Sequence, residues 1–455
     1  MPGASHVTDL RGRSVLGSFF HAPGPDAAPL LASALIEIGL DGCIVSVTGM
    51  ADPAYAANVG SASRSGSLTR LDGFVLPGFV DLHVHAPQYP QLGQALDIPL
   101  QDWLQRYTFP LEARYADLVF AGQAYAALVD DLLAGGTTTA VYFGTIHGPA
   151  TRLLAELCVA RRQRALVGKV AMDHPDLCPA SYRDDDADAG LHGTRSLIDE
   201  IRLLPGNDGL VHPVVTPRFV PACTDRLLEG LGDIVRAGHC HVQTHCSESD
   251  WAHRHVLDRF GRSDAEVLDG FGLLTRRTVL AHANFLSAAD MDRVALRGSG
   301  VAHCALSNAY FAGAVFPLRA AMQRGVRVGL GTDISGGPSA SMFEAVRMAV
   351  AASRMLESGV DPDLSPELRG RPGSRIDIRT AFHLATAGGA DVLALPVGRF
   401  EPGYLFDAML IDPAAPGGTI RLWGGESDDD LLATLLYSAS RPNIAAVWTG
   451  GCPAG

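Results

Sequence analysis

Long apolar runs, paired cysteines and clusters of basic residues are all missing from this chain. No apolar run approaches the roughly 20 residues that a membrane-spanning helix needs. The eight cysteines are scattered and form no CxxC pair, which favours a reduced, cytoplasmic protein. A formal net charge of −13 without basic clusters argues against binding to nucleic acid or to an anionic membrane. Residues 1–13 also lack the basic-then-apolar order of a secretory signal.

Short apolar runs at both ends of the chain predict a small β domain. The 455 residues are 47% hydrophobic and 19% charged, as in an ordinary globular enzyme. Residues 34–38 and 43–47 are separated by glycine and aspartate, which is typical of a β-hairpin. Similar runs return at 406–411 and 444–449. We therefore expect residues 1–72 and 398–455 to form one β domain around a larger domain, residues 73–397.

In this larger domain, apolar runs alternate with helical patterns, of which residues 227–235 and 342–350 are examples. The expected strands are residues 78–85, 138–143, 165–172, 211–216, 241–244, 278–281, 300–303 and 327–331. Eight strand–helix repeats predict an α/β fold with a parallel (β/α)8 barrel of the TIM type. In that fold, catalytic residues follow the carboxyl ends of the strands.

Metal-binding residue types stand at several of these strand ends. The first strand ends in His83 and His85, and alternate residues of a strand point the same way, so both imidazoles can share one ion. His245 ends the fifth strand, and Asp333 follows the eighth. Three imidazoles and one carboxylate leave a position for water, as a catalytic zinc or iron site requires. An ion held there would lower the pKa of that water from about 15.7 towards about 7.

Glu248, His282 and Asp333 are the candidates for proton transfer at this site. Glu248 is placed to move protons between the water and a leaving group, His282 to hydrogen-bond the water, and Asp333 to accept its proton. Each has a structural alternative: a satisfied buried histidine at 282, a helix N-cap at 333 and a glutamate in the first turn of a helix at 248. The joint pattern over four strand ends favours the metal site.

A second metal ion is not expected. Many barrel hydrolases bridge two metals with a modified lysine on the fourth strand, but here that strand is followed by Arg218. Lys169 lies within the third strand, where a structural role is the better interpretation. The sequence therefore favours one metal ion.

Longer motifs surround these residues. Residues 77–89 read Pro-Gly-Phe-Val-Asp-Leu-His-Val-His-Ala-Pro-Gln-Tyr. Further motifs stand at residues 103–104, 107–110, 135–140, 143–147, 168–173, 216–219, 329–333 and 384–390. Together they resemble the one-metal deaminase branch of the amidohydrolase superfamily, and more closely its guanine deaminase family. The resemblance covers roughly residues 74 to 412, and His-Ala-Pro-Gln, Tyr-Thr-Phe-Pro and Thr-Pro-Arg-Phe are its more specific pieces.

The resemblance implies zinc-dependent hydrolysis of guanine to xanthine and ammonia, in purine catabolism or salvage. It also implies a cytoplasmic homodimer with one ion per subunit, zinc or alternatively iron. The implied metal ligands are His83, His85, His245 and Asp333. The implied substrate-binding residues are His85, Gln88, Arg218, Phe219, His245, Glu248 and Asp333.

The chemistry of Arg218 agrees with guanine as the substrate. The C6 carbonyl of guanine only accepts hydrogen bonds, and a guanidinium only donates them. Adenine carries an amino group at C6, so a hydrogen-bond donor of the purine would face the donors of Arg218. Such a mismatch can discriminate strongly against adenine. Gln88 both donates and accepts, which suits the mixed edge of a purine. The alternative for Arg218 is a structural salt bridge.

The match is incomplete, so other substrates stay open. The family pattern His-Cys-Pro-x-Ser-Asn is here His303-Cys304-Ala305-Leu306-Ser307-Asn308, and loss of the proline is expected to relax the loop through residue 316. An 8-substituted guanine, another amino-heterocycle or, less favoured, a cyclic amide are the alternative substrates. Tyr404 replaces a lysine usual in the superfamily. Deaminases with a Pro-Cys-x-x-Cys motif are excluded because that motif is absent. A catalytically dead scaffold would have lost at least one metal ligand, whereas this chain retains every proposed ligand.

Overall fold

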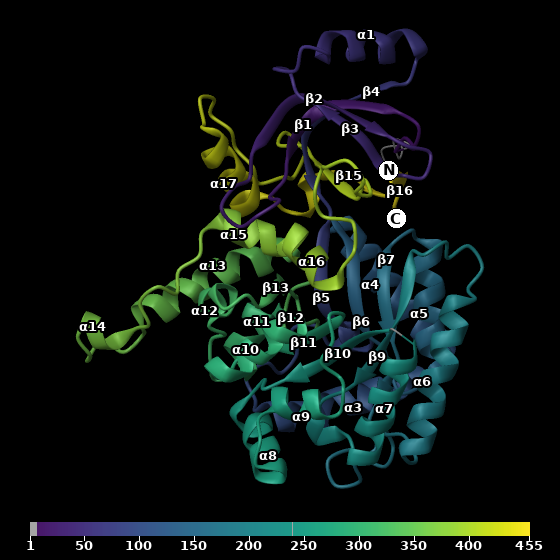
Figure 1. The fold of residues 1–455 in the computed structure, drawn as a ribbon, viewed down its shortest axis with the longest axis vertical. Coiled ribbons are helices and arrows are strands. Elements are labelled where there is room, and N and C mark those ends of the chain that lie inside the picture. The colour runs from purple at the N-terminus through teal and green to yellow at the C-terminus, as the bar shows by residue number, and fades with distance from the viewer. Residues whose placement is uncertain (1–6, 239) are drawn as a thin grey trace.

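Eight parallel strands in the middle of the chain form a barrel in the computed structural model, which describes residues 7–238 and 240–455 (Figure 1). They are paired in the order β5-β6-β7-β9-β10-β11-β12-β13, and the short β8 pairs with β9. Their bounds are β5 Phe79–His85, β6 Thr137–Phe143, β7 Arg164–Gly168, β8 Val170–Ala171, β9 Val211–Pro217, β10 His241–Cys246, β11 Thr278–His282, β12 Gly300–His303 and β13 Arg327–Leu330. The strands are almost wholly buried, which explains why they appear in the sequence as short apolar runs. The predicted barrel is confirmed.

The segment that follows β13 closes the barrel against β5. The backbone N–H of Asp333 donates to the carbonyl of His83 over 2.9 Å, and that of His85 donates to the carbonyl of Ile334 over 2.8 Å. A Cβ atom at Gly331 would lie 2.9 Å from the Cβ of His83, which is closer than packed side chains approach. Glycine at 331 therefore allows the last strand to meet the first.

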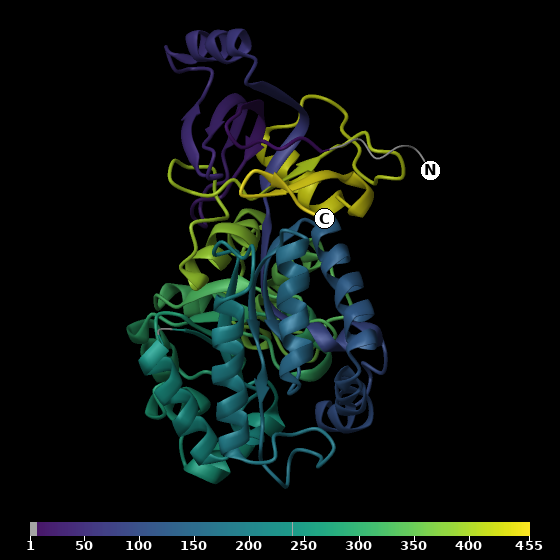
Figure 2. The same ribbon diagram turned by 90° about the vertical axis from the view of Figure 1, so that its right-hand side faces the viewer.

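Helices stand along the outside of the barrel strands (Figure 2). Those between or after barrel strands are α4 Leu118–Ala134, α5 Gly148–Ala160, α6 Ala187–Arg202, α7 Asp225–Gly238, α8 Asp250–Phe260, α9 Asp264–Gly270, α10 Ala288–Arg297, α11 Ala305–Phe311, α12 Leu318–Gln323 and α13 Met342–Ser358. In α7, Leu227, Leu228, Leu231 and Val235 are buried at helical spacing, so one stripe of the helix covers the strands. The helices predicted at 227–235 and 342–350 lie inside α7 and α13.

Two irregular segments complete the barrel. The first leaves the end of β5 and carries η1 Ala86–Gln91, α2 Leu100–Trp103, the π-helical turn η2 Leu104–Thr108, α3 Phe109–Ala113 and η3 Arg114–Ala116. The second follows α13 and carries α14 Pro366–Arg369, α15 Ile378–His383, the π-helical turn η5 Leu384–Gly388 and α16 Gly389–Leu393. The first segment follows the end of a barrel strand, where the fold places its functional residues.

Both ends of the chain contribute to a second sheet, ordered β16-β15-β14-β4-β1-β2-β3. Its strands are β1 Ser14–Phe20, β2 Leu30–Ile38, β3 Ile44–Thr48, β4 Leu68–Pro77, β14 Ala408–Ile411, β15 Ile444–Thr449 and β16 Cys452–Pro453, with α1 Tyr55–Ser65 and α17 Asp428–Ser438 beside them. The hairpin expected near the amino terminus is the antiparallel pair β2–β3. The domain boundaries at 72/73 and 397/398 stay predictions; β4 runs through Pro77 into β5, and residues 1–6 lie outside the described residues.

A buried ion pair connects this sheet to the barrel. Arg164, the first residue of β7, donates to both carboxylate oxygens of Asp407 over 2.9 and 3.2 Å. Asp407 stands just before β14, and its carbonyl accepts from the N–H of Gly78 at the start of β5. The β sheet therefore contacts the barrel at the amino-terminal ends of its strands. Among the described residues, no helix has both the length and the apolar character needed to cross a membrane.

Candidate active site

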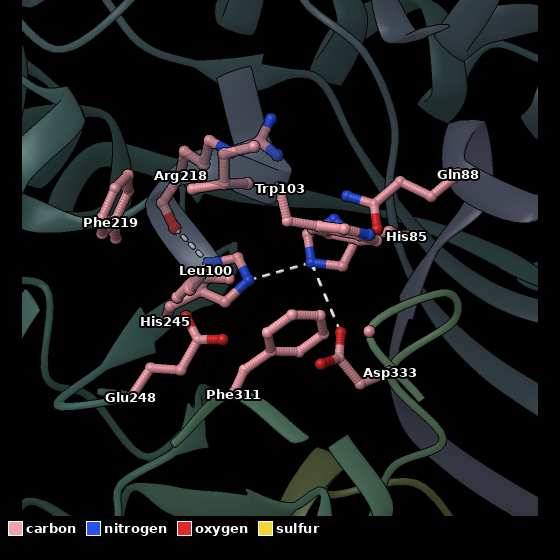
Figure 3. A pocket seen from close by; sticks show the side chains of 12 residues that line it. His85, Gln88, Leu100, Trp103, Arg218, Phe219, His245, Glu248, Phe311 and Asp333 are labelled. Carbon is pink, nitrogen blue, oxygen red and sulfur yellow. Dashed lines mark hydrogen bonds and ion pairs between the residues drawn. The ribbon is translucent and has the colours of Figure 1, made fainter. Parts of the chain in front are cut away.

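The imidazoles of His83, His85 and His245 converge at the carboxyl-terminal mouth of the barrel. One ring nitrogen of each lies within 4.8 Å of the others. The Nε2 atoms of His85 and His245 are 2.9 Å apart, and Asp333 Oδ1 lies 3.6 Å from His85 Nε2 (Figure 3). The same Asp333 oxygen lies 3.1 Å from His83 Nε2. The structure thus brings together the four side chains that the sequence predicted as ligands of one ion.

This cluster fits a divalent metal ion. Ligand atoms about 2.1 Å from one tetrahedral ion lie about 3.4 Å apart, close to the spacings found here. Apart from its contact with Asp333, the Nε2 of His83 is buried without a polar partner, although buried polar atoms are normally hydrogen-bonded. Burial and neighbouring imidazoles hold the pKa values of His85 and His245 well below their usual value, so both rings are neutral and ready to bind metal.

Backbone contacts fix the orientation of His245. Its Nδ1 donates to the carbonyl of Arg218, which leaves Nε2 as the lone-pair atom that faces the other ligands. The backbone N–H of His245 donates to the same carbonyl over 3.3 Å. Orientation of a metal-binding histidine by its second nitrogen is common in metalloenzymes, and here Arg218 supplies it.

Glu248 and His282 lie beside the cluster, close to Asp333. Nε2 of His282 is 3.6 Å from Glu248 Oε1 and 3.7 Å from Asp333 Oδ2. Burial raises the pKa of Glu248, although His282 opposes this effect. Burial alone would also raise the pKa of Asp333, but His83 and the other imidazoles outweigh it and keep Asp333 ionised. The two carboxyl groups are therefore tuned in opposite directions, as acid–base chemistry requires.

Left-handed backbone conformations gather around these side chains. The φ angles of Ser247, His282 and Asp333 are +46°, +68° and +52°. Non-glycine residues rarely adopt such angles, which persist where surrounding contacts enforce them and are concentrated at functional sites. Here the contacts include two backbone hydrogen bonds: the N–H of Ala283 donates to the carbonyl of Cys246, and the N–H of Asn284 donates to the carbonyl of Ser247. The strand ends are bent so that their side chains face the mouth of the barrel.

A cavity opens beside the cluster, with about 400 Å³ of empty space that includes its open mouth. Its lining residues are His85, Gln88, Leu100, Trp103, Leu104, Arg218, Phe219, His245, Glu248, Phe311, Asp333 and Gly336. All seven residues expected to bind substrate are among them, and Figure 3 shows Gln88 and Arg218 at one side of the cavity with Glu248 and Asp333 at the other. His83 and His282 lie outside this lining.

Glu112 is a residue that the sequence analysis did not single out. It is fully buried on α3, where it accepts two hydrogen bonds from Arg218, over 2.7 and 3.0 Å, and one from Gln88 over 2.9 Å. The salt bridge considered as the alternative for Arg218 therefore exists, and Arg218 also lines the cavity. Arg218 and Gln88 come from distant parts of the chain, so in the sequence only the position of Glu112 just after Tyr-Thr-Phe-Pro could have drawn attention to it.

Comparison with known proteins places this site in a family. The sequence profile of the Amidohydrolase family matches residues 74–453. The chain belongs to the amidohydrolase family. A probable guanine deaminase of Schizosaccharomyces pombe is 38% identical over 383 residues, which are 83% of this chain and 71% of that protein. Human guanine deaminase is 36% identical over 386 residues, 83% of this chain and 82% of that protein.

Solved structures of this family have the same fold. Guanine deaminase from C. acetobutylicum, with guanine bound in its active site, superposes with a TM-score of 0.85 at 29% identity, covering 97% of this chain and all of the other. The E. coli guanine deaminase gives a TM-score of 0.85 at 28% identity, covering 97% and 99%.

The segment that departs from the family pattern is helical. Ala305–Phe311 form α11, so this part of the segment is a helix and not the expected relaxed loop. Asn308 on α11 accepts a hydrogen bond from Nδ1 of His282 over 2.9 Å and donates to Asn284 over 2.8 Å. Because Nδ2 of Asn308 is the donor to Asn284, its Oδ1 faces His282, and the hydrogen lies on Nδ1 of His282. Nε2 of His282 is therefore free to accept a proton.

Lys169 takes no part in the candidate site. It is the single lysine of the chain, and its buried ammonium donates to Asp184 over 2.6 Å. This agrees with the structural role predicted for it. Residues at the end of β9 offer no lysine to bridge a second metal ion.

Proposed function

We propose that this protein hydrolyses guanine to xanthine and ammonia. The observation that carries the proposal is the cavity itself, which has Arg218 and Gln88 at one side and a histidine–aspartate cluster with Glu248 at the other. The guanidinium offers donors to a carbonyl, and the opposite side offers acid–base groups to a reacting carbon. The curated relatives named above act on guanine according to their names, which supports the same substrate here.

In this proposal, Arg218 donates to the C6 carbonyl and Gln88 pairs with the neighbouring edge of the purine, so that C2 faces Glu248. Phe219 packs against the ring. Glu248 takes one proton from the attacking water and gives it to the ring nitrogen beside C2. His282, with Nε2 free to accept, and ionised Asp333 hold the water, receive its second proton and pass it to the exocyclic amine, which leaves as ammonia.

A metal ion held by His83, His85, His245 and Asp333 acidifies water and so supplies the nucleophile near neutral pH. We propose zinc as this ion, because three imidazoles and a carboxylate suit it, with iron as the alternative. Metal analysis of the purified protein is expected to give one equivalent per chain. His83→Ala is expected to lose the metal.

We further propose a homodimer in a reducing compartment such as the cytoplasm. All eight cysteines are free, and seven of them are buried, which agrees with an environment that forms no disulfides. The dimer is proposed on the family resemblance and is checked by light scattering of the purified protein.

The test is a turnover assay with guanine. Zinc-loaded protein is expected to convert the ultraviolet spectrum of guanine to that of xanthine and to release one ammonia per guanine. Adenine at the same concentration is the control and is expected to be inert, because its C6 amino group faces Arg218. Metal-replete protein that leaves guanine unchanged would refute the proposal.

An 8-substituted guanine is the second candidate substrate. Phe311, from the segment that departs from the family pattern, lines the cavity beside Trp103, with ring centroids 5.1 Å apart. The shape of this wall decides whether a purine with a group at C8 fits. A higher kcat/KM for 8-oxoguanine than for guanine would make it the preferred substrate, whereas a lower value would exclude it.

A further inference from the structure

Glu112 contacts both purine-reading side chains without lining the cavity. It comes from α3, Gln88 from η1 and Arg218 from the end of β9, so three separate segments meet at one carboxylate. All three side chains are at most 2% exposed. In such a dry environment, a guanidinium without a partner would impose a strong positive field on any ligand beside it.

The orientation of the Gln88 amide is fixed by two partners of opposite kind. Its Nε2 donates to Glu112 over 2.9 Å, while its Oε1 accepts from the backbone N–H of Ser335 over 3.2 Å. A flipped amide would put oxygen against carboxylate and N–H against N–H, so the orientation is unique. One amide hydrogen and one lone pair of Gln88 then remain for the ligand.

Glu112 also supplies the charge that balances Arg218. Burial alone would lower the pKa of Arg218, but the neighbouring carboxylate of Glu112 outweighs this effect and raises it. Tyr182 and Cys178 also face Arg218, yet burial raises the pKa of Cys178 to about 12 and holds the pKa of Tyr182 well above its usual value. Both are neutral, and neither can replace the charge of Glu112.

We propose that Glu112 is a positioning and specificity residue that keeps the purine-reading side of the cavity neutral, so that the site prefers neutral purines to purine anions. The inference rests on the proposed function, because guanine is neutral at neutral pH whereas its product xanthine begins to lose a proton there. With Arg218 balanced by Glu112, this side of the cavity has no unpaired positive charge to hold the xanthine anion, which favours its release. Without Glu112, the charge of Arg218 would retain it.

The experiment measures xanthine binding to zinc-loaded protein between pH 6 and pH 9, by calorimetry. For the wild type, the Kd is expected to weaken at least tenfold as xanthine ionises. For Glu112→Gln, which has the same shape without the charge, this weakening is expected to disappear or reverse. Hypoxanthine, which stays neutral to higher pH, is the ligand control. Glu156→Gln, which removes a glutamate paired with Arg152 on the surface of α5, is the variant control.

The outcomes separate this inference from the proposed function. A pH dependence in Glu112→Gln equal to that of the wild type overturns the role of Glu112 and leaves guanine hydrolysis standing. A wild type that binds the anion more tightly than neutral xanthine also overturns it, and this measurement needs no variant to fold. Glu112→Asp retains the charge and is expected to keep the wild-type pH dependence while raising the KM for guanine. Wild-type protein that neither turns over guanine nor binds xanthine overturns the proposed function itself.

Discussion

Glu248 lies between the metal-binding cluster and the cavity, as its proposed role in proton transfer requires. It lines the cavity, and its carboxyl is 3.6 Å from His282, whose free nitrogen is directed by Asn308. Asn284 fixes the backbone of Glu248 by donating to its carbonyl over 2.8 Å. The side chain can therefore change its protonation state while its backbone stays in place.

Replacing Glu248 with glutamine is expected to abolish proton transfer and to spare metal binding. We expect kcat to fall about 10³-fold, within the range typical of a lost general acid–base group. Steady-state kinetics measure the loss, and metal analysis checks that one equivalent is retained. Asp250→Asn, an exposed change at the start of α8, is the control and should behave as the wild type. A variant at position 248 with normal kcat would remove Glu248 from the mechanism.

At the scale of elements, the strand ends carry most of what the sequence could reveal. His83, His85, His245 and Asp333 follow directly on apolar runs, so recognising the strands placed them at one mouth of the barrel. Glu112 could not be placed in this way. It lies on the five-residue α3, and its partners are 24 and 106 residues away, so only the folded chain brings them together. The same holds for Asn308, whose role depends on how α11 lies against β11.

The start of α9 provides a pH test of stability. Asp264 is 3% exposed and accepts a hydrogen bond from Ser247 over 2.9 Å, and burial raises its pKa from 3.8 to about 7. The carboxyl proton of Asp264 is therefore bound more tightly in the folded state than in the unfolded state. The stability that this proton contributes is complete below about pH 4 and is lost as the pH rises through about 7. Asp264→Asn cannot ionise and avoids this loss.

We therefore expect the free energy of unfolding of Asp264→Asn, relative to the wild type, to increase by about 2 kcal/mol between pH 5 and pH 8. Urea denaturation at both pH values measures this difference. The exposed Asp250→Asn variant serves again as the control and should show no such change. An equal difference at pH 5 and pH 8 would mean that Asp264 is ionised throughout this range.

At the scale of the whole molecule, the barrel and the terminal sheet depend on each other through the ion pair of Arg164 and Asp407. Their side chains are 7% and 1% exposed, and Asp407 also accepts from the N–H of Gly450 over 2.7 Å. A buried carboxylate that loses its partner strongly lowers the free energy of unfolding, whereas removal of both charges often changes it little.

Arg164→Met is expected to destabilise the protein by about 3–5 kcal/mol, because it leaves Asp407 charged and buried. Adding Asp407→Asn, which keeps an acceptor for Gly450, is expected to restore at least half of the loss. Thermal and urea unfolding of the two single variants and the double variant measure the coupling. If the losses of the single variants simply add, the pair does not connect the two parts of the molecule energetically.

The closure of the barrel determines which parts of this enzyme can be redesigned. Gly331 has no space for a methyl group because the first metal ligand stands against it, and the same seam carries the hydrogen bonds between Asp333 and β5. Selection for a new heterocycle therefore has little freedom on that side, where any larger side chain would displace the catalytic centre. Leu100, Trp103 and Phe311 also line the cavity, but they lie on short helices outside the barrel strands. Libraries that diversify those three positions should yield altered substrate range with the metal centre preserved.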